Sequence, residues 1–99
     1  MAKEIHDIAQ ANHMGVWCGG MLETGIGRAV NVALVTLPIF VYPNGISASK
    51  RYWEKDIIDP PFSLNADGKI DVPSGPDLGI TMDEKALARV TQAREVIRL

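Results

Sequence analysis

Apolar residues in the first part of the chain recur at helical spacing. Ile5, Ile8 and Ala9 fall at positions i, i+3 and i+4, which predicts a helix over residues 2–13 with one apolar stripe. No N-cap residue stands between Met1 and these periodic positions. The pattern therefore leads us to expect that the chain begins partway through a structural element, inside a helix.

A second helix is predicted over residues 26–37, between two short apolar runs. Thr24 is a suitable N-cap residue, and Pro38 ends the helical pattern. Residues 16–18 and 40–42 have the length and composition of buried strands. A strand, a helix and a strand in this order form a right-handed parallel unit in nearly all known cases. The apolar face of this helix consists of Ile26, Ala29, Val30, Ala33, Leu34 and Leu37.

The remaining chain is more irregular. A short helix is expected within residues 47–53, and residues 65–68 (Asn-Ala-Asp-Gly) have the composition of a hairpin turn. Asp83 is expected to cap a last helix that runs past Arg94. Two parallel strands leave two open edges, so the pattern favours part of a larger α/β sheet or barrel over a complete domain.

Composition excludes several classes of protein. The chain has 46% hydrophobic and 22% charged residues and a net charge of −2, which is ordinary for a globular protein. Its basic residues are scattered, so no nucleic-acid partner is expected. The apolar stretch 29–42 is too interrupted to span a bilayer, and no membrane partner is expected. A single cysteine, Cys18, permits no internal disulfide, and a cytoplasmic location is the expectation.

The glycine-rich segment 16–28 carries the strongest functional signal. It leads from a strand through Gly19 and Gly20 to the start of a helix, and ligands of α/β folds bind at that end of a strand. Free N–H groups at the helix start can hold an anion such as a carboxylate. The alternative is a tight turn that needs glycine only for its backbone conformation. The spacing matches neither a dinucleotide fingerprint nor a P-loop.

Three blocks of sequence resemble the o-succinylbenzoate synthase and N-acylamino acid racemase family of the enolase superfamily. They are Trp17–Ala29 followed by Asn31, the stretch Ile46–Ile58, and the tail Val72–Gly79. The resemblance covers nearly the whole chain. It implies an α/β fold, namely the last two parallel strands of a (β/α) barrel with the helix between them. A hairpin and a helix of an α+β capping domain would follow.

The same resemblance implies a division of the chain and a reaction. Residues 1–58 would run from the end of the sixth barrel helix to the eighth strand and the helix after it, and residues 59–99 would complete the capping domain. The family abstracts a proton next to a carboxylate and then dehydrates or racemises the substrate, and its synthase serves menaquinone biosynthesis. Bound Mg²⁺ stabilises the enediolate, while lysines on two faces act as acid and base.

The family's catalytic lysines and metal carboxylates lie on strands two to six of the barrel. They have no counterpart in this chain, so we expect no catalytic residue and no metal ligand here. What the resemblance leaves is the loop after the seventh strand, which lies against the substrate. The expected substrate-binding residues are Gly19, Gly20, Met21, Leu22 and Glu23.

This chain departs from the family's usual pattern at three positions. Gly45 stands where the family usually has Asp, Val30 where it has His, and Asp77 where it has Gly. These differences bear on how well the chain would complement the rest of an active site.

Other polar residues have an ordinary structural interpretation. Cys18 is expected to be buried and inert, and Glu23 either contacts substrate or caps a helix. His6 and His13 are too far apart on a helix to share a metal ion, and both are expected to be solvated. The remaining charged candidates, expected on solvated surfaces, are Glu54, Asp56 and Asp59, together with two lysines not expected to be catalytic, Lys50 and Lys55.

Two hypotheses from different classes follow. In the first, the chain is a fragment of a magnesium-dependent enzyme that acts on a small-molecule carboxylate, and the fragment is inactive alone. In the second, it is a small interaction module, or half of a split enzyme that docks on another chain. Its partners would then be the missing barrel portion or a second copy.

Overall fold

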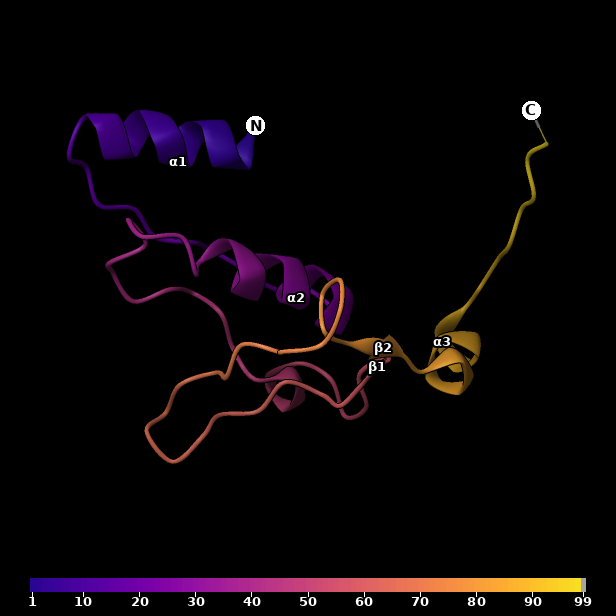
Figure 1. Ribbon diagram of the computed structural model, residues 1–99. Coiled ribbons are helices and arrows are strands. Elements are labelled where there is room, and N and C mark those ends of the chain that lie inside the picture. Colours follow the sequence, from indigo (N-terminus) through magenta and orange to yellow (C-terminus); the bar gives the residue numbers. More distant parts are fainter. Residues whose placement is uncertain (99) are drawn as a thin grey trace.

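A computed structural model describes residues 1–98 of the chain. Figure 1 shows the order of its elements. They are the helices α1 (Ala2–Ala11) and α2 (Gly25–Leu34), the 3-10 turn η1 (Ser49–Arg51), the strands β1 (Ile58–Asp59) and β2 (Thr81–Met82), and the helix α3 (Glu84–Val90). None of the helices in the described residues has the length and apolar character needed to cross a bilayer.

The two apolar runs that flank α2 approach each other in parallel, as expected. Val16 forms a parallel bridge with Phe40, and Gly19 forms another with Gly45. The Val16 N–H donates to the Ile39 carbonyl at 2.9 Å, and the Gly45 N–H donates to the Cys18 carbonyl at 2.8 Å. The pairing stays limited to these bridges, and their place as seventh and eighth strands of a barrel remains a prediction.

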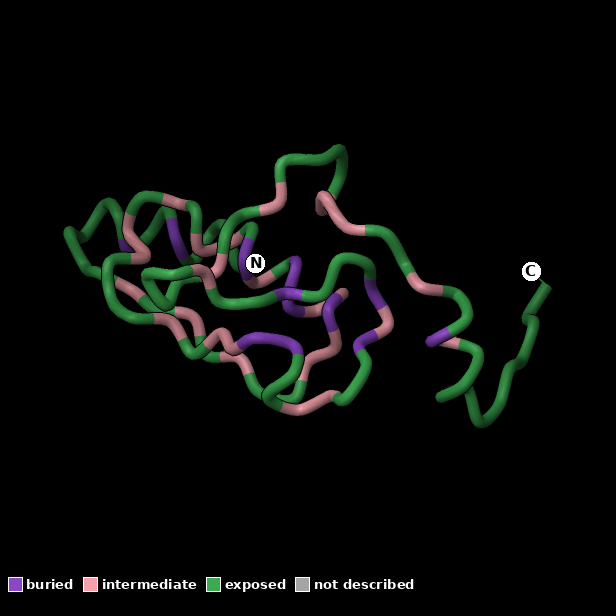
Figure 2. The backbone as a smooth tube through the Cα atoms, turned by 90° about the horizontal axis from the view of Figure 1, so that it is seen from below, coloured by how far each residue is buried: buried purple, intermediate pink, exposed green. Residues whose placement is uncertain are grey.

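A small apolar core lies between α2 and the second half of the chain. Ala29 and Val32 of α2 are buried together with Ile58 and Phe62. Figure 2 shows that most of the buried residues lie in the main body of the molecule, while Ala86 in α3 is buried apart from them. Partly buried apolar side chains surround this core, namely Ile26, Ile46, Ile70, Leu78 and Ile80. The core contains residues from both sides of position 58. The division of the chain into residues 1–58 and 59–99 therefore stays a prediction.

Helix α1 packs through a face that its periodicity does not predict. His6 and Ala9 are buried, whereas Ile5 and Ile8 are 57% and 65% exposed. The His6 ring stacks on Phe40, with 6.3 Å between ring centroids. The expected apolar stripe is therefore only partly right: Ala9 is buried, but Ile5 and Ile8 are not, because the helix turns His6 and not the two isoleucines toward Phe40. The helix also ends at Ala11, two residues earlier than expected.

Local turn and cap signals in the second half are mostly confirmed. Leu64 and Ile70 form an antiparallel bridge around the predicted hairpin turn, and Gly68 adopts a positive φ of 72° there. The Asp83 side chain caps α3 by accepting the Ala86 N–H at 2.9 Å. The expected continuation of this helix past Arg94 is wrong: α3 ends at Val90. Residues 91–98 are exposed, so no tertiary packing supports further helical turns.

The short helix expected within residues 47–53 is only the 3-10 turn η1, and α2 ends at Leu34 rather than at residue 37. One pairing had no sequence signal: β1 and β2 form a two-stranded antiparallel sheet that joins Ile58 to Met82 and Asp59 to Thr81. The structure thus confirms α/β content.

The described chain is less compact than a closed domain. Its radius of gyration is 15.6 Å, against about 13 Å for a compact domain of 100 residues. In Figure 1, α3 and the chain after it extend away from the body that contains α1 and α2. Burial is correspondingly sparse, and many large apolar side chains remain exposed.

Candidate functional site

The loop Gly19–Glu23 begins where the two parallel segments end and leads into α2. Besides the bridge between Gly19 and Gly45, the Cys18 N–H donates to the Asn44 side-chain oxygen at 2.8 Å. Gly45 approaches this loop so closely that a Cβ there would lie 3.4 Å from the Gly20 backbone nitrogen. The loop therefore starts from a fixed point at the carboxyl end of both segments.

Glu23 fixes the other end of the loop. Its carbonyl oxygen accepts the Trp53 indole N–H at 2.9 Å and an Arg28 guanidinium N–H at 3.1 Å. Its side-chain carboxylate accepts the Asn31 amide at 3.1 Å. The carboxylate thus neither caps α2 nor stands free, because it accepts a hydrogen bond from Asn31 in the second turn of that helix. Its contact with a substrate remains a prediction.

Between these two anchors the loop presents apolar side chains to solvent. Met21 is 73% exposed and Leu22 is 60% exposed. Leu22 adopts a φ of 61°, a left-handed conformation that costs a non-glycine residue about 1–3 kcal/mol and persists only where its surroundings impose it. Gly20 faces inward, where a Cβ would lie 2.9 Å from the Glu23 carboxylate. All five predicted substrate-binding residues therefore lie on one loop, with Met21 and Leu22 available for contact.

A buried charge network lies behind this loop. Arg28 is 1% exposed and pairs with Asp56 at 3.3 Å. Ser49 binds both residues: its hydroxyl donates to the Asp56 carboxylate at 2.5 Å and accepts from Arg28 at 3.2 Å. Asp56 also accepts the Gly25 N–H at 2.8 Å. Most hydrogen-bond acceptor positions of the Asp56 carboxylate are thus occupied by donors of the protein itself.

This network corrects two expectations. Asp56 is buried rather than solvated, because it pairs with Arg28 and Ser49, whereas Glu54 and Asp59 are exposed as expected. The first N–H of α2 was expected to be free for an anion, but the chain's own Asp56 binds it. Thr24 is the N-cap as predicted, yet its side chain makes no capping hydrogen bond.

Arg28 lies outside the apolar face predicted for α2, so nothing in the sequence indicated its burial. The residues that α2 buries are Gly25, Arg28, Ala29 and Val32, whereas Val30 of the predicted face is 50% exposed. Arg28 can be buried on this face because Asp56 pairs with it from a distant block of sequence. The indole of Trp53 and the amide of Asn31 had no signal in the sequence either, because both residue types are common on partly exposed surfaces.

The two histidines differ in their surroundings. His13 is exposed, as expected. His6 is only 4% exposed, so its expected solvation is wrong. Its Nδ1 lies 2.9 Å from the Asp7 carboxylate, and its buried Nε2 has no hydrogen-bond partner among the described residues. Stacking on Phe40 explains the burial, since both rings pack between α1 and the parallel segments.

Cys18 and the lysines have no features of catalytic groups. Cys18 is half-buried, and not fully buried as expected. This partial burial, and to a lesser extent the negative charge of Glu23, raises the pKa of the Cys18 thiol above its usual value, which keeps it in the less reactive protonated form. Lys50 is exposed. Lys55 forms a surface ion pair with Asp83 at 3.0 Å.

Magnesium does not fit the part of the chain that the structure describes. No three His, Cys, Asp or Glu side chains within residues 1–98 come together as a metal site. Asp56, the one buried carboxylate side chain among these residues, is already bound by Arg28, Ser49 and two backbone N–H groups. We therefore assign no metal-dependent step to these residues.

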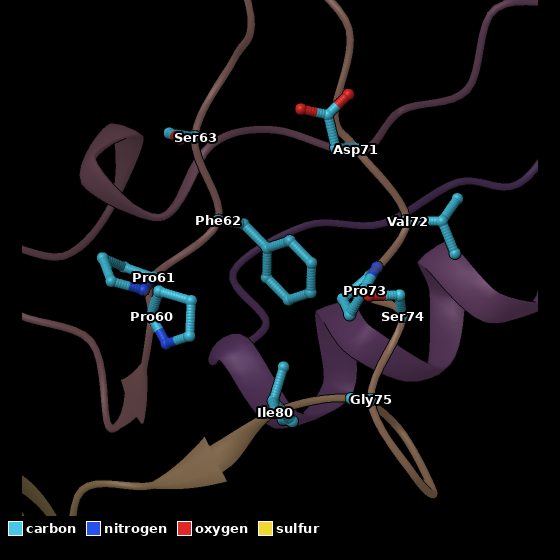
Figure 3. Close-up of a pocket in the computed structure, with 11 residues that line it drawn as sticks. Pro60, Pro61, Phe62, Ser63, Asp71, Val72, Pro73, Ser74, Gly75 and Ile80 are labelled. Atoms are coloured by element: carbon cyan, nitrogen blue, oxygen red, sulfur yellow. The ribbon is translucent and has the colours of Figure 1, made fainter.

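A cavity of about 400 Å³ lies in the second half of the chain, apart from the loop. Figure 3 shows the Phe62 ring and Ile80 inside it, with Pro60 and Pro61 on one side and Pro73 on the other. Residues 60–63, 71–75 and 79–80 line this cavity, and its only ionisable group is Asp71. A cavity without a cluster of polar groups gives no sign of chemistry.

Comparison with known proteins identifies similar sequences and folds. A family profile described as enolase C-terminal domain-like matches residues 1–86. The chain is 45% identical over 95 residues to an o-succinylbenzoate synthase of Bacillus subtilis, covering 96% of this chain and 25% of that protein. It is 47% identical over 93 residues to an N-succinylamino acid racemase of Amycolatopsis, covering 94% of this chain and 25% of that protein.

A solved structure agrees with these sequence matches. It is a member of the enolase superfamily from Listeria innocua, with a TM-score of 0.85 and 44% identity over 91% of this chain and 24% of that one. The chain thus spans about a quarter of the length of the relatives that it matches.

Proposed function

The chain belongs to the enolase C-terminal domain-like family, and on this premise we propose that it is the C-terminal part of a magnesium-dependent o-succinylbenzoate synthase or N-acylamino acid racemase. In this proposal residues 1–58 complete a (β/α) barrel, and residues 59–99 complete a capping domain. The loop Gly19–Glu23 faces a small carboxylate substrate from which other parts of the barrel remove a proton. A cytoplasmic location and a role of the synthase in menaquinone biosynthesis belong to the same proposal.

One observation carries the assignment of the loop. Gly19–Glu23 is fixed at both ends, at Gly45 on one side and at the Glu23 carbonyl on the other, while Met21 and Leu22 remain exposed between them. A rigid loop with exposed apolar side chains, at the carboxyl end of parallel strands, is the arrangement from which barrel enzymes build their substrate sites. A loop that served only as a turn would not need two side-chain donors on one carbonyl.

The proposal assigns binding, and not proton transfer, to this chain. Proton abstraction next to a carboxylate needs a positioned base and stabilisation of the developing negative charge. Lys50 and Lys55 are exposed or engaged at the surface, and Asp56 is neutralised by Arg28. We therefore propose that the chain is inactive alone, and that the acid, the base and the Mg²⁺ ligands belong to the remaining part of the barrel.

A chimera tests this proposal. The 95-residue stretch of the Bacillus subtilis synthase that aligns with this chain would be replaced by the corresponding residues of this chain. We expect the chimera to form product in the presence of Mg²⁺, and the isolated chain to form none above an uncatalysed blank. Product formed by the isolated chain and abolished by a chelator would contradict its proposed inactivity. A folded but inactive chimera would contradict the proposed function.

Substitutions in the chimera test the loop separately. Met21→Ala should lower kcat/KM, because Met21 is the most exposed side chain of the loop. Gly20→Val should lower it further, since the added carbon atoms would displace the Glu23 carboxylate. Glu54→Gln is a matched control on an exposed residue outside the loop. Equal effects of all three substitutions would contradict the assignment of the loop.

A second candidate function is an interaction module or half of a split enzyme. The observation that favours it is the exposure of large apolar side chains along both parallel segments: Trp17 is 60%, Val41 65% and Tyr42 55% exposed. Exposed apolar groups of this size are typical of protein interaction surfaces. The isolated chain would then bind the remaining barrel portion supplied as a separate polypeptide, or a second copy of itself. Co-purification of the two polypeptides with restored product formation would support this candidate.

A further inference from the structure

The Glu23 carbonyl is held by two side chains from separate parts of the fold. Trp53, which follows η1, donates its indole N–H at 2.9 Å, and Arg28 of α2 donates a guanidinium N–H at 3.1 Å. A carbonyl oxygen has two lone pairs, so both of its acceptor positions are used. This fixes the orientation of the peptide group at the end of the loop Gly19–Glu23.

Arg28 has little freedom to move away from this position. Its other terminal nitrogen donates to Ser49 at 3.2 Å and to Asp56 at 3.3 Å. The Ser49 hydroxyl donates to Asp56 and also accepts the Phe62 N–H at 3.1 Å, which ties the network to the apolar core. The hydroxyl therefore uses its one donor and both acceptor positions. Each member of the network is held by another.

Stability alone gives a weak reason for such a network. A buried ion pair loses so much hydration that apolar side chains of the same volume are often equally stabilising or more so. A guanidinium, unlike an apolar group, can hold several hydrogen-bond acceptors at once in a fixed geometry. Here one guanidinium joins Asp56, Ser49 and the Glu23 carbonyl.

We infer that Trp53 and Arg28 are positioning residues that fix the substrate loop through the Glu23 carbonyl, with Asp56 and Ser49 holding Arg28 in place. The link to substrate rests on the proposed function, whereas the claim that these residues make the loop rigid concerns the loop alone. It accounts for the left-handed Leu22, since that conformation needs surroundings that impose it. It also explains how Met21 and Leu22 can remain exposed and still occupy defined positions.

Nuclear magnetic resonance on the ¹⁵N-labelled 99-residue chain tests whether Trp53 and Arg28 make the loop rigid. The chain contains two tryptophans, so their indole N–H signals are easily assigned. The Trp53 indole proton should exchange with water more slowly than that of Trp17, which is 60% exposed. In Trp53→Phe, which removes the donor and keeps an aromatic ring, the heteronuclear NOE of Met21, Leu22 and Glu23 should fall. That of the α2 amides should not change.

Tyr52→Phe, at the aromatic neighbour of Trp53 that makes no hydrogen bond to the Glu23 carbonyl, is the matched control and should leave the NOE of the loop unchanged. Equal exchange rates of the two indole protons, or an unchanged loop NOE in Trp53→Phe with α2 intact, would overturn the inference. So would an unmodified chain whose α2 amides are unprotected, because the hydrogen bonds at Glu23 require that helix. Arg28→Lys should mobilise the loop in the same way, because lysine has no second fixed nitrogen to reach Glu23.

The link to substrate is tested in the chimera. Trp53→Phe should lower kcat/KM about three- to tenfold, the change expected for loss of one hydrogen bond. Most of the change should appear in KM, and Tyr52→Phe should have no such effect. An inactive chimera with the expected loop dynamics would contradict the proposed function alone. An active chimera in which Trp53→Phe changes neither KM nor loop dynamics would overturn this inference alone.

Discussion

The carboxylate of Asp56 accepts the N–H of Gly25 at 2.8 Å, across 31 positions of sequence. Gly25 is the first residue of α2, where unpaired N–H groups and the helix dipole favour a negative charge. The same carboxylate binds Arg28 one turn further along the helix. One buried side chain therefore caps α2 and orients the arginine that holds the loop before it.

The first prediction concerns this carboxylate. Asp56→Asn keeps the size of the side chain but leaves the buried Arg28 charge unpaired. Removing one partner of a buried ion pair typically costs about 3–5 kcal/mol. We expect the free energy of unfolding of the chimera, measured in urea, to fall by an amount of this order. Asp59→Asn, on an exposed residue three positions away, should change it by less than about 0.5 kcal/mol.

The second prediction concerns pH and the start of α3. The Ala86 N–H, and to a lesser extent Lys55, lowers the pKa of Asp83 below its ordinary value of 3.8. The ionised Asp83 carboxylate therefore contributes its full stabilisation of the folded state above pH 3.8. This contribution is lost as the pH falls through the lower pKa that Asp83 has in the folded state. The Ala86 amide shift should follow this titration. Lys55→Met should move the midpoint upward, and Asp83→Asn should abolish the titration while preserving the cap.

The third prediction concerns Cys18, the one cysteine of the chain. Burial and the nearby Glu23 charge raise the pKa of its thiol, so less thiolate is present at a given pH. Iodoacetamide should modify the folded chain more slowly at pH 8 than the chain in denaturant. Glu23→Gln removes the nearby negative charge, so it should increase the rate at which iodoacetamide modifies Cys18 in the folded chain. A rate equal to that of the denatured chain would contradict the raised pKa and the partial burial of this thiol.

Local signals in the sequence predict local structure well in this chain. The Asp83 cap and the turn at Gly68 each depend on residues within a few positions of one another. The parallel approach of Val16 and Phe40 follows from the order of the apolar runs. The predicted loop residues also lie together, because they are consecutive in the chain.

Features that depend on distant residues were not predictable in the same way. Arg28 and Asp56 are 28 positions apart, and no periodicity in the sequence links two single residues at that distance. Periodicity also cannot say which face of α1 meets Phe40. The buried face contains His6, whose polar character pointed to solvent, while Ile5 and Ile8 remain exposed. Tertiary packing, and not hydrophobicity, decided the orientation of that helix.

The last prediction concerns association of the isolated chain. The described residues bury few large apolar side chains, whereas Trp17, Val41 and Tyr42 along the parallel segments, and Ile5 and Ile8 on α1, are each more than half exposed. At about 25 cal/mol per Å², leaving a few hundred Å² of apolar surface in water forfeits several kcal/mol, which is comparable to the whole stability of a small domain.

We therefore expect the isolated chain to be marginally stable and to self-associate. Sedimentation should give a mass above that of a monomer, increasing with concentration, and thermal unfolding should be broad. The double variant Ile5→Lys and Ile8→Lys should lower the average mass, because it removes two apolar side chains from an exposed helix face. The same change at Val96 and Ile97, which are also exposed but belong to the extended tail, controls for added charge. A monomer with a sharp transition above about 60 °C, within the range of stable small domains, would contradict the prediction and favour an independent module.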